Sequence, residues 1–201
     1  MRNLKLFAFL IWVTAVTGCS YAENQNLQDG DIIFQRMQSS QCVAIEAATD
    51  SQYTHLGLIF MEDGKPFVYE AVQPVRKTPL QAWIQQGRDH HYVVKRLRDY
   101  ESVNFQAVKQ QAAAMLGKNY DALFGWSDNR IYCSELVWKA YQRGADIEVG
   151  TLRQLEDFNL EHATVKQLMR QRYGDDVPLK MTVISPADIF DSEKLITVQK
   201  S

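Results

Sequence analysis

Ile131-Tyr132-Cys133-Ser134-Glu135-Leu136-Val137-Trp138-Lys139-Ala140-Tyr141-Gln142-Arg143-Gly144 is the stretch that decides the fold. Its apolar residues recur at helical spacing, and Gly144 is typical of the residue that ends a helix. Cys133 would lie on the buried face in the first turn. Free backbone N–H groups and the helix dipole favour a negative charge there by about 0.3–1 kcal/mol, which favours a thiolate. The stretch therefore predicts either a reactive thiol or a small buried core cysteine.

The composition is that of a globular protein. The chain has 201 residues, of which 46% are hydrophobic and 23% are charged. This length predicts one domain with an ample core. The net charge of −2 and the lack of a basic patch exclude a nucleic-acid footprint. Three cysteines are too few for a disulfide framework, and Cys42, in a short apolar helical segment, is interpreted as core.

The amino terminus has the pattern of an export signal. Arg2 and Lys5 precede an apolar run over residues 6–16, which is too short to span a membrane. Loss of residues 1–18 would leave 20 basic against 24 acidic residues, a net charge near −4. The domain organisation expected is a lipoprotein-type signal peptide (1–18), a polar tether (19–28) and a hydrolase domain (29–201).

The end of this segment resembles a bacterial lipobox. In that motif, matched here by Val16-Thr17-Gly18-Cys19, the cysteine is lipidated and becomes the first residue of the mature protein. Ser20 is not the aspartate that retains lipoproteins at the inner membrane, so the resemblance implies a periplasmic protein anchored to the outer membrane through Cys19. Cleavage after Ala22, which would release a soluble periplasmic protein, is the alternative.

A predicted hairpin brings a histidine and a glutamate together. Asp63-Gly64 is a strong two-residue turn signal between strands over residues 54–60 and 66–72. With those two residues as the loop, Gly57 lies opposite Glu70, and His55 is the diagonal neighbour of Glu70 on the same face. Gly57 leaves room for the carboxylate to lean toward the imidazole. A surface ion pair is the alternative interpretation of this pair.

These residues form a set suited to nucleophilic catalysis. A thiolate needs a base that takes and returns a proton, and the base needs a partner that fixes its tautomer. Cys133, His55 and Glu70 are of the three residue types required. The backbone N–H of Cys133 is a candidate oxyanion donor.

Other segments predict the remaining architecture. Strands are expected at residues 32–35, 92–97 and 181–184, and Thr78-Pro79 and Ser185-Pro186 have the pattern of helix starts. An antiparallel sheet packed against the cysteine-bearing helix, an α+β fold, follows from these elements.

Several of these segments also resemble a known family. Leu116-Gly117-Lys118-Asn119-Tyr120, Gly125 and Cys133-Ser134-Glu135-Leu136-Val137 are similar to the stretch around the nucleophile in NlpC-type cell-wall peptidases, which have a papain-like fold. Gly30-Asp31-Ile32-Ile33-Phe34 and His55-Leu56-Gly57-Leu58 resemble the segment that follows it in those enzymes. Here that segment comes first, as in the circularly permuted YaeF/YiiX-like amidases.

The resemblance implies a role for each matching residue. Cys133 would be the nucleophile, His55 the general base and acid, and Glu70 the residue that orients His55. Tyr120 matches the tyrosine that helps to form the oxyanion pocket. Tyr132 stands where unpermuted enzymes commonly have aspartate, which puts the identity of the substrate in doubt.

Three further residues approach the nucleophile in sequence. Trp126, Ser127 and Asp128 are candidates for the lining of the cleft, together with Tyr132, although an ordinary surface loop is an equal alternative.

The function expected is thiol-dependent hydrolysis of an amide through an acyl-enzyme at Cys133, with no cofactor or metal. An exported protein suggests a peptidoglycan-derived peptide or an amino-acid amide as substrate. Three alternatives remain open. They are lipid acyl transfer or deacylation as in the lecithin retinol acyltransferase-like branch, a metal hydrolase using the same three residues, and a non-catalytic module that binds peptides or lipids.

Overall fold

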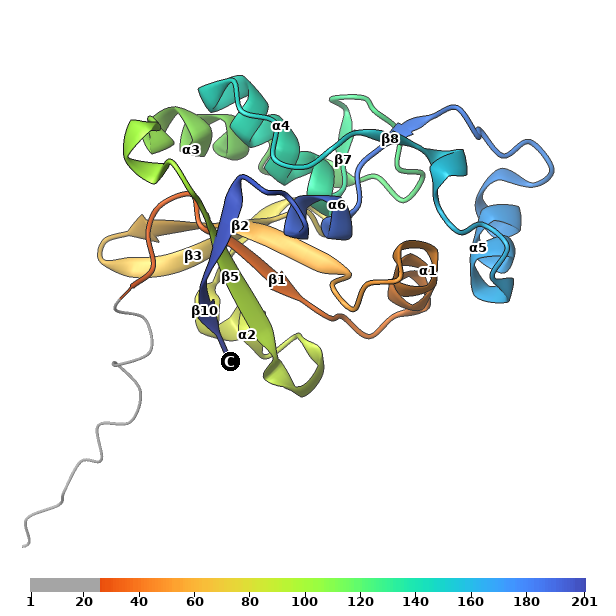
Figure 1. The fold of residues 1–201 in the computed structure, drawn as a ribbon, viewed down its shortest axis with the longest axis horizontal. Coiled ribbons are helices and arrows are strands. Elements are labelled where there is room, and N and C mark those ends of the chain that lie inside the picture. The colour runs from red at the N-terminus through yellow and green to blue at the C-terminus, as the bar shows by residue number, and fades with distance from the viewer. Residues whose placement is uncertain (1–25) are drawn as a thin grey trace, which may run out of the picture.

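The computed structural model describes residues 26–201, within which an antiparallel six-stranded sheet is flanked by helices (Figure 1). In spatial order the strands are β10 (Leu195–Lys200), β5 (Tyr92–Leu97), β1 (Ile32–Gln35), β2 (His55–Glu62), β3 (Lys65–Glu70) and β4 (Arg76–Pro79). Short two-stranded pairs are formed by β6 (Asn119–Tyr120) with β7 (Arg130–Ile131) and by β8 (Arg153–Gln154) with β9 (Thr182–Val183). The α-helices are α1 (Ser40–Thr49), α2 (Leu80–Ile84), α3 (Phe105–Ala113), α4 (Cys133–Ala145), α5 (Ala163–Tyr173) and α6 (Pro186–Phe190). The predicted α+β class is confirmed.

Most of the predictions for the amino terminus concern residues that the structure does not describe. The predicted signal peptide and the lipidation site at Cys19 lie outside the described residues. Leu27, in the segment predicted to be a tether (residues 19–28), is buried in a core cluster. Within residues 26–201, no helix has the length and apolar character needed to cross a bilayer.

The hairpin of β2 and β3 has the predicted register. Asp63 and Gly64 both have positive φ, 49° and 73°, as a two-residue turn of this kind requires. Glu62 pairs with Lys65, and this register continues to place Gly57 opposite Glu70. A Cβ on Gly57 would lie 2.4 Å from Val68 Cγ1, so a glycine is needed for the close approach of the two strands.

Helix α4 lies across one face of the sheet together with α3, as Figure 1 shows. The prediction that Gly144 ends the helix is wrong, because α4 continues to Ala145 and ends at Asp146, whose φ is 57°. Gly144 instead faces α3, where an added Cβ would lie 2.6 Å from the Cα of Val108. The glycine allows the two helices to cross closely.

Each face of the sheet has its own apolar cluster. Leu58 and Phe34 contribute to the cluster shared with α3 and α4, in which Leu136 and Cys133 are also buried. The opposite face packs against α2 through a cluster that includes Trp83. Beyond one end of the sheet, α1 and α5 pack together through a third, smaller cluster.

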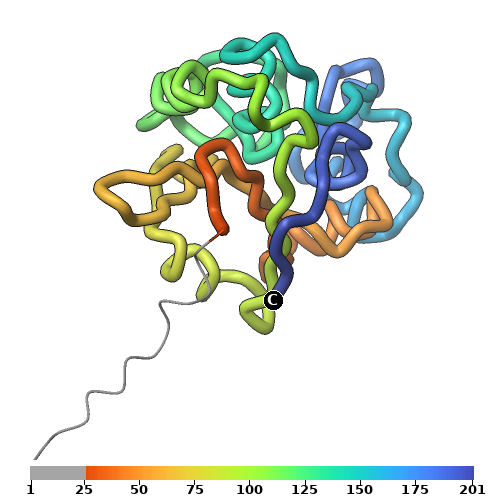
Figure 2. The backbone as a smooth tube through the Cα atoms, turned by 60° about the vertical axis from the view of Figure 1, so that its left-hand side comes forward, coloured from red at the N-terminus to blue at the C-terminus, as the bar shows by residue number. Residues whose placement is uncertain are grey.

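Two elements differ from the sequence prediction. Thr78 does not cap a helix, because residues 76–79 form β4, in which Thr78 pairs with Val68, and α2 begins only at Leu80. Strand β10 was not predicted, since its alternation is weak and several of its residues are exposed. Figure 2 shows this C-terminal strand running beside β5.

Candidate active site

The imidazole of His55 and the carboxylate of Glu70 meet as the hairpin register predicts. His55 Nε2 lies 2.7 Å from Glu70 Oε2, and both side chains are buried. His55 is the first residue of β2 and Glu70 the last of β3, so the pair sits at the end of the hairpin opposite the turn. The contact is a hydrogen-bonded pair inside the protein, not the surface ion pair of the alternative interpretation.

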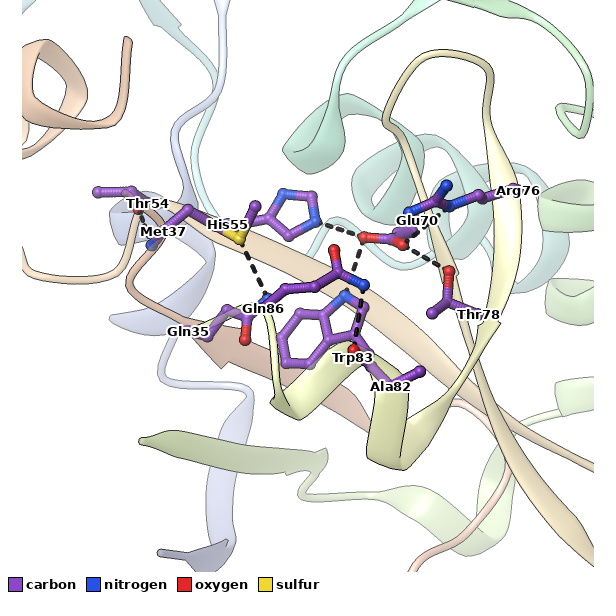
Figure 3. Close-up of polar contacts among 10 residues, drawn as sticks. All are labelled: Gln35, Met37, Thr54, His55, Glu70, Arg76, Thr78, Ala82, Trp83 and Gln86. Carbon is purple, nitrogen blue, oxygen red and sulfur yellow. Dashed lines mark hydrogen bonds and ion pairs between the residues drawn. The ribbon is translucent and has the colours of Figure 1, made fainter. Parts of the chain in front are cut away.

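Glu70 is surrounded by donors, as Figure 3 shows. Thr78 Oγ1 donates to Oε1 at 2.6 Å, Trp83 Nε1 donates to Oε2 at 3.0 Å, and Arg76 Nε approaches Oε1 at 3.4 Å. Burial raises the pKa of Glu70, but the hydrogen bond and charge of His55, together with Thr78 and Arg76, outweigh it and lower the pKa. Glu70 is therefore a carboxylate at neutral pH.

Cys133 lies on the other side of the imidazole. It is the first residue of α4, is 4% exposed, and lies close enough to the imidazole to raise the pKa of His55. Burial lowers the pKa of His55, but hydrogen bonds to Cys133 and Glu70 and their negative charges raise it to about 10. Because Glu70 occupies Nε2, Nδ1 is the ring nitrogen left to face the thiol. Trp83 stacks on the ring, with centroids 5.8 Å apart.

The start of α4 is anchored to the segment that precedes α6. Ser134 Oγ donates to the carbonyl of Ile184 at 2.7 Å, and the N–H of Ile184 donates to Tyr132 Oη at 3.1 Å. Glu135 accepts a hydrogen bond from the N–H of Tyr132 at 3.2 Å. These contacts hold the peptide groups on both sides of Cys133.

Tyr120 approaches the same site from β6, which pairs with β7. Its hydroxyl accepts a hydrogen bond from Gln41 Nε2 at 2.7 Å. Burial is the main cause that raises the pKa of Tyr120, and negative charge on Cys133 raises it further. Tyr120 therefore lies near the sulfur as a neutral phenol, the state in which it donates a hydrogen bond.

An apolar pocket opens beside Cys133, between α1 and α5. Tyr132, a predicted candidate for the cleft lining, and Cys133 are among the residues that line it. The walls are aliphatic and aromatic side chains, among them Ala44, Ala48, Phe124, Leu155, Phe158, Val165, Leu168 and Met169.

Trp126, Ser127 and Asp128, the other candidates for the cleft lining, are not among the residues that line this pocket. They pack farther along α4 instead. Trp126 contacts Trp138 edge to face, and Asp128 forms ion pairs with Lys139 and Arg143. The chain leaves the site before residue 126 and returns to it only at β7, so nearness in sequence to Cys133 does not place these residues in the site.

Comparison with known proteins decides the family. Residues 26–199 match the family described as "Permuted papain-like amidase enzyme, YaeF/YiiX, C92 family". The chain belongs to this C92 family. The predicted resemblance is confirmed, and the permuted papain-like fold and a general assignment to thiol amidases or peptidases come with it.

Two relatives match the C92 domain over most of its length. "Uncharacterized protein YiiX" of Escherichia coli strain K12 is 46% identical over 174 residues, which are 86% of each chain. The crystal structure of yiiX from Escherichia coli O157:H7 has a TM-score of 0.83 and 46% identity, covering 87% of this chain and 97% of that one. Its description calls that protein a metalloprotein.

Some residues of this C92 site escaped the sequence analysis. Thr78 and Trp83 hydrogen-bond to Glu70. Thr78 was missed because Thr78-Pro79 before an apolar segment has the pattern of a helix start, although residues 76–79 form a strand. Recognition of residues 76–79 as a strand paired with β3 would have placed Thr78 near Glu70. Gln41, which contacts Tyr120, has no local signal because the two lie 79 residues apart.

Proposed function

We propose that this protein hydrolyses amide bonds through an acyl-enzyme at Cys133, with His55 as general base and acid and Glu70 as its orienting partner. The observation that supports this most directly is the imidazole of His55, which is hydrogen-bonded to the buried carboxylate of Glu70 and lies close enough to Cys133 for that residue to raise its pKa. This is the arrangement that nucleophilic acyl transfer requires.

The chemistry follows from the protonation states. A His55 pKa raised to about 10 favours an imidazolium at neutral pH, which can protonate a leaving group. The thiolate attacks the carbonyl carbon, and the imidazolium protonates the leaving amine as the carbon–nitrogen bond breaks. His55 then takes a proton from water, whose oxygen attacks the thioester and releases the acid. The backbone N–H of Cys133 and the hydroxyl of Tyr120 would bind the oxyanion.

The test uses the full chain with two probes, alanine 4-nitroanilide as an amide and 4-nitrophenyl acetate as an activated ester. We expect release of the nitroaromatic product and, by intact mass, one acetyl group on the wild type after the ester. Cys133→Ala should lose both, and His55→Gln should slow acylation by at least about 100-fold. A Cys133→Ala variant that hydrolyses the amide as fast as wild type would sink the proposal.

The proposed substrate is a small peptide or an amino-acid amide, such as a fragment of peptidoglycan. The support is the lipobox-like Val16-Thr17-Gly18-Cys19, because a lipid anchor on Cys19 would hold the domain at the outer membrane beside the cell wall. Membrane fractionation of wild type and Cys19→Ala tests this location, with release of the variant into the soluble periplasmic fraction as the expected outcome.

A second candidate, lipid deacylation or acyl transfer, is favoured by one observation. The pocket beside Cys133 is walled almost entirely by apolar side chains. A peptide main chain would find few polar partners in it, whereas an aliphatic acyl group would bury well. Incubation with a mixture of cell-envelope peptides and phospholipids, followed by the mass of the adduct on Cys133, separates a peptidyl from a fatty acyl intermediate.

The residues at the site do not suit a resident metal ion, although one related protein is described as a metalloprotein. Within residues 26–201, no group of three or more His, Cys, Asp or Glu side chains could hold a metal ion. The donors of Thr78, Trp83 and Arg76 all point at the Glu70 oxygens, which leaves that carboxylate without a free position for a cation. The proposed steps therefore use no metal.

A further inference from the structure

A chain of three polar side chains leads from the pocket wall to Tyr120. Arg172, in the last turn of α5, donates through Nη2 to Gln41 Oε1 at 2.5 Å. Gln41, in the first turn of α1, donates through Nε2 to Tyr120 Oη at 2.7 Å. The three residues come from distant parts of the chain and meet beside the pocket that contains Cys133.

The direction of these hydrogen bonds is determined by chemistry. A guanidinium has only donors, so the side of the Gln41 amide that faces Arg172 must be its oxygen. The NH₂ group therefore faces Tyr120 and donates to its hydroxyl. A phenol that accepts a hydrogen bond from an amide keeps its own single proton for another acceptor.

The surroundings hold Arg172 in this role. Its guanidinium lies 4.8 Å from the centre of the Phe124 ring, and its Nη1 is buried without a hydrogen-bond partner in the described part of the chain. Gln41 Oε1 is therefore the acceptor that engages this cation. Arg172 also lies one turn beyond Leu168 and Met169, which line the pocket from the same helix.

We propose that Gln41 and Arg172 are positioning residues that orient Tyr120, so that its hydroxyl proton points at the oxyanion formed on the carbonyl attacked by Cys133. The inference rests on the proposed function, because it gives Tyr120 a tetrahedral intermediate to bind. It assigns a role in the reaction to α1 and α5 beyond the formation of the pocket walls.

Two reactions of the same thiol separate positioning from folding. Acylation of the full chain by 4-nitrophenyl acetate forms an oxyanion, whereas alkylation by iodoacetamide displaces iodide and forms none. We expect Tyr120→Phe to slow acylation by about 100-fold and Gln41→Leu by roughly tenfold. Both variants should be alkylated at Cys133 within about twofold of the wild-type rate, since no oxyanion is formed in that reaction.

Substitutions that change only the hydrogen bonding sharpen the test. Gln41→Glu still accepts from Arg172 but cannot donate to Tyr120, so it should slow acylation at least as much as Gln41→Leu. Arg172→Met removes the donor that fixes the orientation of the Gln41 side-chain amide. The amide can then flip, and acylation should slow about as much as in Gln41→Leu. Arg172→Lys keeps a cationic donor and should retain most of the activity.

A double-mutant cycle decides whether Gln41 acts through Tyr120. Gln41→Leu should have no further effect on acylation in the Tyr120→Phe background. If Gln41→Leu slows acylation by the same factor in the Tyr120→Phe background as in the wild type, the inference is overturned. It is also overturned if Gln41→Leu alone slows alkylation as much as acylation. Either result leaves the proposed acyl-enzyme intact. Acylation that persists in Cys133→Ala would overturn both the inference and the proposed function.

Discussion

The imidazole of His55 interacts with two side chains that both raise its pKa. Glu70 Oε2 lies 2.7 Å from Nε2 of the ring, and Cys133 is close enough to raise the pKa of His55 as well. Each partner favours the protonated ring, against a burial that disfavours it. The balance of these three effects decides whether the thiol is paired with an imidazolium before substrate arrives.

The pKa of His55 reports this balance. Titration of the His55 ring by NMR should give a pKa near 10 in the wild type. Cys133→Ser removes the sulfur and Glu70→Gln removes the carboxylate, the two groups that raise the pKa of His55, so both variants should lower that pKa. An unchanged His55 pKa in both variants would contradict the ion-pair description.

The carboxylate of Glu70 depends on elements that join β3 at the sheet edge. Strand β4 contributes Thr78 and Arg76, and helix α2 contributes Trp83. Loss of a hydrogen bond to a buried charged group costs about 1.5–3 kcal/mol, more than loss of one between neutral groups. The edge strand is thus part of the site.

Substitution of Thr78 tests this contribution of β4. Thr78→Val keeps the size of the side chain but removes the hydroxyl donor, so we expect acylation by 4-nitrophenyl acetate to slow by roughly tenfold. Thr78→Ser keeps the donor and should stay within about threefold of wild type. Equal rates in Thr78→Val and Thr78→Ser would show that the hydroxyl has no effect on catalysis.

Besides Glu70 on β3, a buried carboxylate on helix α4, that of Glu135, lies close to the nucleophile. Glu135 lies 2.6 Å from Lys139, but burial outweighs this pairing and raises the pKa of Glu135 to about 7. A carboxyl whose folded pKa is raised holds its proton more tightly when folded. Its contribution to stability is therefore complete below about pH 4.5 and is lost as the pH rises through 7.

Glu135→Gln isolates this titration. The free energy of unfolding of the wild type, measured with urea, should fall relative to that of the variant between pH 4.5 and 7. The slope can reach at most about 1.4 kcal/mol per pH unit for one proton. The amide introduced by the substitution would still accept a hydrogen bond from the N–H of Tyr132. Parallel curves for the two proteins over this window would contradict the raised pKa.

At the scale of the whole molecule, the pocket between α1 and α5 should decide which acyl groups react. Ala48 lines it, so Ala48→Phe should slow acylation by 4-nitrophenyl octanoate by about tenfold or more and leave the acetate ester within twofold. Val43→Phe, at an exposed position of the same helix, is the matched control and should change neither rate. Equal slowing of both esters by Ala48→Phe would point to a general disturbance of the fold.

Sequence reasoning succeeded where a local signal determines geometry. Asp63-Gly64 sets the hairpin register, and that register brings His55 to Glu70. Tyr120 was found through family resemblance. Thr78 was misinterpreted because a strand ending in Pro79 resembles a helix start, and Arg172 was missed because its contact with Gln41 spans 131 residues. Contacts between residues so far apart in the sequence produce no periodic pattern from which they could be predicted.

The hairpin also implies an order of assembly. His55 and Glu70 are only 15 residues apart, so their pairing closes a short loop, whereas Cys133 must be brought in from much farther along the chain. We expect the imidazole–carboxylate pair to form early during folding and the sulfur to dock late. A partly folded chain would then carry a thiol without its base, which reacts with acyl donors more slowly than the thiol of the complete molecule.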